Sequence, residues 1–324
     1  MSTPSTSGNN TSAILSPDQL ARLRKIIQTR IHSDDGQLLM GVHMGDLLKE
    51  LIKNFRQVSG DRAVPIRRAF LVGGAASHII NEEYGFTDSD LELEIDPGYP
   101  TSRREERNIF DGIREAIFDM LRMKMEKAKF NMEDSGLIEK FIAKKVLIHN
   151  ETEAWSLFSF HHVNKANLEI KSVLRMGRKY QFASDSLRID LTPLLGDFGD
   201  FHVSSSYGTV QEVTDLLRDK IIKTKQPENI HGGGLLKYCL LKAKGFKDNE
   251  SKLLSKKLRK AMADGFLRTF EKGTTTKFLQ NHFKGDQFYV HREQFLMELT
   301  NFRDRLKQHL EIIKEEVMLF NPNH

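Results

Sequence analysis

The sequence predicts an α+β protein in which a mixed-sheet domain is followed by a helical domain. Two observations predict this class. Short runs with strand alternation are interleaved with helical patterns over the first two thirds of the chain. From Thr209 onward the apolar periodicity is that of helices. We therefore divide the 324 residues into a disordered N-terminus at 1–15, a mixed-sheet domain at 16–205 and a helical domain at 206–324.

The first elements follow from local composition and capping. Residues 1–15 are mostly Ser, Thr, Asn and Gly, with little to bury, which predicts disorder. Ser16 can cap a helix that begins at Pro17, and Gln19 stands where a capping-box partner would. A second helix is expected at 45–55, with an apolar stripe that comprises Leu47, Leu48, Leu51 and Ile52.

Strands and helices then alternate along the chain. We expect a strand at 66–72, a short helix at 75–81 and a strictly alternating strand at 90–95. A long helix is expected at 104–125. The remaining expected elements are strands at 154–161 and 166–173, a strand pair within 178–195 that turns near 183–186, and helices at 209–225, 232–246, 251–270 and 292–320.

Composition and charge limit the class of protein. The chain is 39% hydrophobic and 29% charged, as expected of a globular protein with real cores. The single cysteine, Cys239, excludes an internal disulfide and a Cys-rich zinc module, and fits a reducing compartment. No apolar run approaches the roughly 20 residues that span a bilayer, and the N-terminus lacks a signal-peptide pattern. We expect a cytoplasmic protein, with a nuclear pool as the alternative.

Net charge gives a weak indication of the partner. The formal charge is +5 and the sequence pI is about 9.1. This balance permits a polyanionic partner, such as nucleic acid or nucleotide phosphates, without requiring one.

The strand at 90–95 carries an acid at every second residue. Asp90, Glu92 and Glu94 therefore share one face. Neighbouring like charges repel, and a divalent cation would relieve that repulsion. The alternative is a half-solvated edge strand, whose charges guard against aggregation.

A glycine pair precedes this acidic strand. Gly73 and Gly74 follow the strand at 66–72 and open a short helix, so backbone amides can approach an anion there. A phosphate cradle beside an acidic metal site suits phosphoryl or nucleotidyl transfer. Glu169, on another alternating strand, can supply a third acid; the alternative is a solvated strand face.

Several motifs, taken in order, carry a family resemblance. They are GGAASH, SDLELEI, AWSLFSF, NLEIKSV, QFASDSLRIDL and DKIIKTKQPENIHGGGLLKYC. Over roughly Gly41 to Leu319 the chain resembles the terminal nucleotidyltransferases of family five, metazoan atypical cytoplasmic poly(A) polymerases within the nucleotidyltransferase superfamily. The resemblance implies a DNA polymerase beta-like palm as the catalytic domain at 16–205, and a helical nucleotide- and RNA-binding domain at 206–324.

The resemblance also implies a function. The expected activity is template-independent RNA adenylyltransfer, in which AMP from ATP is added to RNA 3′ ends to extend poly(A) tails and stabilise mRNA. Asp90, Glu92 and Glu169 would bind two Mg²⁺ or Mn²⁺ ions as the catalytic acids. Gly73 and Gly74 would cradle the triphosphate of ATP.

Residues after the mixed-sheet domain would complete the nucleotide site. The resemblance and local chemistry assign contacts to Tyr207, Lys220, Lys225, Gly232, Gly233, Gly234 and Lys237. The alternatives are a packed hinge residue for the tyrosine, a solvated helix face for the lysines and a flexible turn for the glycines. No RRM, KH or zinc-finger signature accompanies them, so target choice would rest with partner proteins.

Two departures from the family pattern leave alternatives open. The family usually has serine where Gly74 stands and aspartate where Glu92 stands. Magnesium tolerates poor ligand geometry badly, so the longer Glu92 side chain can slow or silence the enzyme. One alternative is therefore an inactive scaffold or RNA-regulatory binding protein that keeps the fold. Another is a transferase for a different nucleotide, such as UTP.

Overall fold

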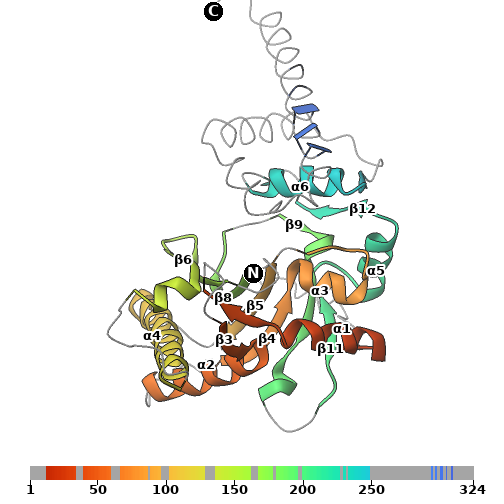
Figure 1. Cartoon of the computed structure of the whole chain (residues 1–324). Coiled ribbons are helices and arrows are strands. Elements are labelled where there is room, and N and C mark those ends of the chain that lie inside the picture. Colours follow the sequence, from red (N-terminus) through yellow and green to blue (C-terminus); the bar gives the residue numbers. More distant parts are fainter. Residues whose placement is uncertain are drawn as a thin grey trace, which may run out of the picture. The chain divides into compact units, whose positions relative to one another are not determined.

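The computed structural model divides the chain into two compact units (Figure 1). The first unit comprises residues 1–177 and 185–214, and the second comprises 178–184 and 215–324. The residues that the structure describes are 12–33, 39–59, 66–86, 88–95, 102–127, 136–161, 167–177, 180–195, 199–226, 229–230, 233–248 and isolated residues between 293 and 308.

A mixed eight-stranded sheet forms the first unit, in the order β1-β11-β10-β4-β5-β8-β7-β6. All neighbours are antiparallel except β5 and β8, which are parallel. This sheet and its helices confirm the predicted α+β class. The strands are β1 (Ala13–Ile14), β4 (Ile66–Val72), β5 (Asp88–Ile95), β6 (Ile142–His149), β7 (Ala154–Phe160), β8 (Asn167–Arg175), β10 (Leu187–Asp190) and β11 (His202–Ser205).

Four helices accompany the described part of this sheet. The α1 helix (Pro17–Ile27) has the predicted capping box, since Ser16 and Gln19 bond each other's backbone N–H. The α2 helix (Met44–Ser59) packs against the long α4 helix (Arg103–Lys127), as Figure 1 shows. The α3 helix (Gly73–Ile80) follows β4 directly and contacts β4, β5 and β10.

Short elements complete the first unit. The strands β2 (Arg30–His32) and β3 (Leu39–His43) pair with each other. Two 3-10 turns, η2 (Ile138–Phe141) and η4 (Thr192–Leu195), precede and follow sheet strands. No described helix is long and apolar enough to cross a membrane.

The N-terminal prediction needs a correction. We expected disorder at 1–15, of which residues 1–11 lie outside the described residues. Ala13 and Ile14 instead pair with β11, and Leu15 is buried. Composition alone did not show that this segment could add a strand to a sheet edge.

Two strand predictions also change. The β6 strand was not expected, because it includes adjacent lysines, Lys144 and Lys145, and has only one fully buried residue. The strand pair expected within 178–195 is wrong as a pair. Its first strand, β9 (Gln181–Phe182), pairs with β13 (Thr224–Lys225), whereas β10 pairs with β4 and β11. The 3-10 turn η3 (Ala183–Asp185) separates β9 from β10.

The helix expected at 209–225 is shorter in the structure. The α5 helix (Val210–Arg218) ends before Lys220, whose φ of +52° lies in the left-handed region and cannot continue a helix. The β-branched pair that follows forms β12 (Ile221–Ile222), which pairs in parallel with β14 (Lys247–Asp248).

In the second unit α6 (Gly233–Ala243) confirms the helix expected within 232–246. The described residues between 293 and 308 are helical, as expected there. The helix predicted at 251–270 lies outside the described residues.

Candidate active site

The acidic strand lies inside the sheet. Along β5, buried residues alternate with the half-buried Asp88, Asp90, Glu92 and Glu94, which confirms the predicted shared face. Since β5 pairs with β4 on one side and β8 on the other, the edge-strand alternative is wrong. The charges therefore need an explanation other than protection of an edge.

The parallel register brings two of the three predicted acids together. Asp90 is the direct partner of Glu169, and Glu92 is the direct partner of Lys171. Paired residues on neighbouring strands point to the same face. Asp90 and Glu169 each have 16% of the side chain exposed. A hydrogen bond between the two side chains helps to raise the pKa of Glu169.

A lysine bridges these two acids. The Lys171 ammonium lies 2.6 Å from Asp90 Oδ1 and 3.4 Å from Glu169 Oε2. Sequence reasoning did not single out Lys171. The available signal was its position two residues after Glu169 on an alternating strand, which places both on one face.

The pKa values of this cluster reflect burial and charge together. The pKa of Glu169 is raised to about 7, chiefly by burial; Lys171 opposes this shift, and the charges of Asp90 and Asp88 contribute to it. Burial works to lower the pKa of Lys171, but the two carboxylates outweigh it and raise that pKa above its ordinary value. The charge of Lys171 therefore does not offset the burial of the Glu169 carboxylate.

The third predicted acid, Glu92, is held by an arginine. Arg188 Nη2 on β10 lies 2.8 Å from Glu92 Oε1 and 3.6 Å from Glu94 Oε2. The guanidinium also stacks 3.9 Å above the centre of the Phe70 ring. Arg188 was not anticipated, because its partner follows from strand order rather than from local pattern. Among the described residues, no three Asp, Glu, His or Cys side chains are grouped closely enough to hold a metal ion.

Gly73 lies against the carboxylate of Asp90. It has a φ of +70°, and a Cβ atom at this position would lie 2.8 Å from Asp90 Oδ2. Both facts require glycine here. The carboxylate of Asp90 thus lies against the first residue of α3, where Val72 precedes the helix without any side-chain oxygen that could cap it.

Gly74, where the family usually has serine, packs closely against Phe86. A Cβ atom at Gly74 would lie 3.2 Å from Cβ of Phe86, a contact tighter than most side chains make. A serine at this position would therefore require Phe86 to move by a few tenths of an ångström. The small residue and the neighbouring phenylalanine fit each other.

The second unit contains most of the other predicted contact residues. Lys220 is exposed, and Lys225 is exposed on β13. Lys237 is half-buried on α6, which begins at Gly233, and Gly232 lies outside the described residues. Tyr207 belongs to the first unit, where it is half-buried and its N–H donates to Ser205 Oγ at 3.1 Å.

Gly234 has a packing role that the sequence did not indicate. A Cβ atom there would lie 2.5 Å from Tyr180 Cζ and Oη. The buried Tyr180 ring thus packs directly on the first turn of α6, and its edge faces Phe182 with 6.1 Å between ring centroids. The close approach that we predicted at this glycine is made by a side chain of the protein itself.

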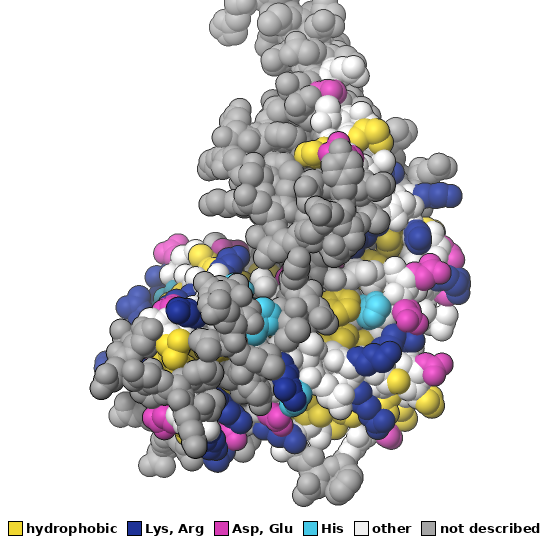
Figure 2. All heavy atoms as spheres, in the orientation of Figure 1, with side chains coloured by type: hydrophobic (Ala, Val, Ile, Leu, Met, Phe, Trp, Pro, Cys, Tyr) yellow, Lys and Arg dark blue, Asp and Glu magenta, His cyan; other side chains and the backbone are white. Residues whose placement is uncertain are grey.

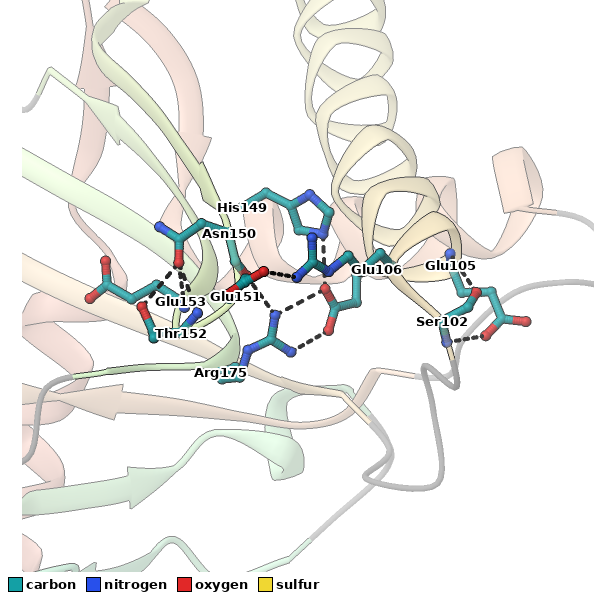
Figure 3. Close-up of polar contacts among 10 residues, drawn as sticks. Ser102, Glu105, Glu106, His149, Asn150, Glu151, Thr152, Glu153 and Arg175 are labelled. Carbon is teal, nitrogen blue, oxygen red and sulfur yellow. Dashed lines mark hydrogen bonds and ion pairs between the residues drawn. The ribbon is translucent and has the colours of Figure 1, made fainter.

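A second acidic cluster lies in the first unit, around Glu106 of α4 (Figure 3). Glu106 Oε2 is 2.8 Å from His149 Nε2, and Glu106 Oε1 is 2.5 Å from Arg175 Nη1. Arg175 also donates to the Asn150 carbonyl at 2.9 Å. Chiefly because Arg175 donates to it, the pKa of Glu106 is lowered from its ordinary value. This cluster joins α4 to the ends of β6 and β8.

Charge on the visible surface is mixed. Figure 2 shows Lys and Arg side chains interspersed with Asp and Glu over the described residues of that face. The described surface in this view therefore offers several basic positions rather than one continuous basic patch.

The site and fold define a class that a comparison with protein families supports. A family model described as Nucleotidyltransferase matches residues 15–314. The chain therefore belongs to this nucleotidyltransferase family.

Individual relatives narrow the resemblance. Terminal nucleotidyltransferase 5C of Rattus norvegicus is 28% identical over 302 residues, covering 87% of this chain and 75% of the relative. Terminal nucleotidyltransferase 5D of Homo sapiens is 29% identical over 255 residues, covering 74% and 64%. Terminal nucleotidyltransferase 5B of Bos taurus is 30% identical over 257 residues, covering 73% and 58%. The resemblance to terminal nucleotidyltransferases of family five is thereby confirmed.

Proposed function

We propose that this chain is a template-independent RNA adenylyltransferase that transfers AMP from ATP to the 3′ end of RNA and extends poly(A) tails. One observation carries the proposal: Asp90 and Glu169 are directly paired beside the start of α3, where Gly73 lies against Asp90. Carboxylates next to a helix N-terminus combine a cation site with a phosphate site. The names of the relatives support terminal nucleotidyl transfer.

The donor set fits a divalent metal ion. Asp90 and Glu169 supply carboxylate oxygens, which are the ligands that Mg²⁺ prefers. Burial, which Lys171 does not offset, raises the pKa of Glu169 to about 7, so added positive charge would favour the ionised carboxylate there. Asp90 and Glu169 would hold the ion, with Glu92 as the third acid once it leaves Arg188. When bound, Mg²⁺ or Mn²⁺ supplies charge neutralisation at the α-phosphate and activation of the RNA 3′-hydroxyl, in a two-metal reaction that releases pyrophosphate.

The chain's own backbone would receive the triphosphate. The first N–H groups of α3 lack a side-chain cap, because Val72 precedes the helix. Gly73 and Gly74 add no side chain of their own beside these groups, so phosphate oxygens can approach the backbone there. In this proposal Lys220, Lys225, Lys237, Gly232 and Gly233 contact the nucleotide, and Tyr207 stacks on a base.

A second candidate function rests on the two positions, Gly74 and Glu92, at which the chain departs from the family pattern. Glu92 is engaged by Arg188, and Gly74 carries no hydroxyl that could bind phosphate. A protein that keeps the fold but binds RNA without catalysis would tolerate both features. This inactive scaffold is the alternative that the activity assay must exclude.

The test is primer extension by the purified full-length protein. Oligo(A) RNA is incubated with each of the four nucleoside triphosphates, with Mg²⁺ or Mn²⁺. We expect extension with ATP, and a loss of at least about 100-fold in Asp90→Asn, which removes a charged ligand. Asp119→Asn, which removes an exposed acid of α4 paired with Arg122, is the matched control and should remain active. Absence of extension with either metal supports the scaffold, and preferential use of UTP overturns the ATP assignment.

A further inference from the structure

We propose that Lys171 is a built-in cation of the metal-free site and that a divalent ion must displace its ammonium group to bind Asp90 and Glu169. The inference rests on the proposed metal site and adds a residue that sets its affinity. The ammonium contacts both acids, at 2.6 Å from Asp90 Oδ1 and 3.4 Å from Glu169 Oε2. It therefore neutralises the same oxygens that would ligate the metal.

The direction of the lysine side chain supports this role. In the sheet register Lys171 lies directly opposite Glu92, so an ion pair between them would be the simplest arrangement. Glu92 instead accepts from Arg188, at 2.8 Å. The ammonium of Lys171 reaches diagonally to Asp90 and back along its own strand to Glu169. It bridges the two acids rather than its cross-strand neighbour.

The charge balance favours exchange. Two carboxylates share one ammonium, whereas a divalent ion would bring twice the charge to the same place. The Lys171 side chain is 31% exposed, about twice as much as either carboxylate. A long flexible stem of this kind can carry its charged end into water without disturbing the buried residues. The lysine can therefore leave the acids while the strand stays in place.

Metal binding and stability should respond in opposite directions when the lysine is removed. Without Lys171 the metal no longer competes with an ammonium, so its affinity should rise. In the metal-free protein the same change leaves two adjacent carboxylates without their cation, so stability should fall. A lysine that only held the strand in place would lower both.

The experiment measures Mn²⁺ binding by the electron paramagnetic resonance signal of free Mn²⁺, together with thermal unfolding in EDTA. We compare full-length wild type with Lys171→Met at pH 8. Lys171→Met is expected to bind Mn²⁺ about three- to tenfold more tightly, as loss of one partly solvated ion pair allows. Its melting temperature should fall in EDTA, and saturating Mn²⁺ should restore it. The matched control is Lys145→Met, which removes a lysine on β6 of the same sheet from its exposed ion pair with Glu139. It should change neither the Mn²⁺ affinity nor the effect of Mn²⁺ on the melting temperature.

A measurement on the wild type covers the case in which Lys171→Met does not fold. Acetylation of lysine amines, located by mass spectrometry, should increase several-fold at Lys171 when Mg²⁺ replaces EDTA and should stay constant at Lys145. Unchanged acetylation at Lys171, or equal or weaker Mn²⁺ binding by Lys171→Met, overturns the inference while the metal site stands. Failure of wild type and Lys171→Met alike to bind Mn²⁺ instead overturns the proposed metal site itself.

Discussion

Two acidic clusters of the first unit differ in their charge balance. Around Glu106 a single carboxylate has two partners, Arg175 and His149, and its pKa is lowered. Around Glu169 two paired carboxylates share Lys171, and the pKa of Glu169 is raised to about 7. Burial is the main cause of the raised pKa of Glu169, whereas at Glu106 the hydrogen bond from Arg175 outweighs burial. The two clusters therefore differ in how far their cations offset the burial of the acids.

The location of the two clusters fits this difference. Glu106 joins a helix to the ends of two strands, where a compensated ion pair fixes the packing. Asp90 and Glu169 lie on adjacent central strands beside the start of α3. The first arrangement is complete within the protein. The second is better satisfied by additional positive charge.

The largest expected effect is on activity, which should depend on the Glu169 cluster. Glu169→Gln should reduce the rate of RNA extension by about 1,000-fold, because it removes a charged oxygen ligand from the proposed metal site. Its free energy of unfolding at pH 8 should not fall, since the substitution relieves repulsion with Asp90. Primer-extension kinetics and urea unfolding measure the two quantities. Glu139→Gln, on an exposed ion pair, is the control. An active Glu169→Gln enzyme would contradict the assignment.

The next effect is on the pH dependence of the free energy of unfolding, which should differ between the two clusters. The pKa of Glu169 is higher in the folded protein, about 7, than its ordinary value of 4.5. The folded state thus binds more protons than the unfolded state in this range. The free energy of unfolding in EDTA should therefore decrease as pH rises from 4.5 to about 7, by up to about 3 kcal/mol from this group.

Glu106 should behave in the opposite sense. Its pKa is lowered, so its contribution to stability is present above its ordinary pKa and is lost as pH falls through the folded value. Urea unfolding at several pH values, in wild type and Glu169→Gln, tests the contrast. If Glu169→Gln leaves the decrease between pH 4.5 and 7 unchanged, another group is responsible for it.

The smallest expected effect is structural. Glu106→Gln should lower the free energy of unfolding by about 2 kcal/mol, because it weakens a buried pair whose arginine is partly exposed. Mn²⁺ affinity should be unchanged. Glu105→Gln, at the adjacent half-buried position whose carboxylate accepts from the Ser102 N–H, should stay within about 0.5 kcal/mol of wild type. A change in metal affinity with Glu106→Gln would mean that the two clusters are coupled.

The faces of the site strands were predictable from sequence, and their neighbours were not. Side-chain direction along a strand follows from the backbone, so the alternation around Asp90 and Glu169 sufficed to assign their faces. That β5 pairs in parallel with β8 depends on tertiary packing of distant segments. For the same reason the partners of Lys171 and Arg188 were missed, although each lies on an alternating strand.

Backbone conformation limited the prediction in the second unit. The helical periodicity after Thr209 is real, but it ends where Lys220 takes a left-handed φ. Lysine gives no sign of this, since glycine and asparagine are the usual residues there. Gly234 was recognised as a position of close approach, but the residue that approaches, Tyr180, follows from the fold alone.

The parallel pairing of β5 with β8 has a consequence for how the protein is made. Asp90 leaves the ribosome long before Glu169, with α4, β6 and β7 between them. A nascent chain that ends before Asn167, or a proteolytic fragment without β8, carries one half of the pair and no lysine to balance it. Truncated products of this protein should therefore lack the proposed metal site.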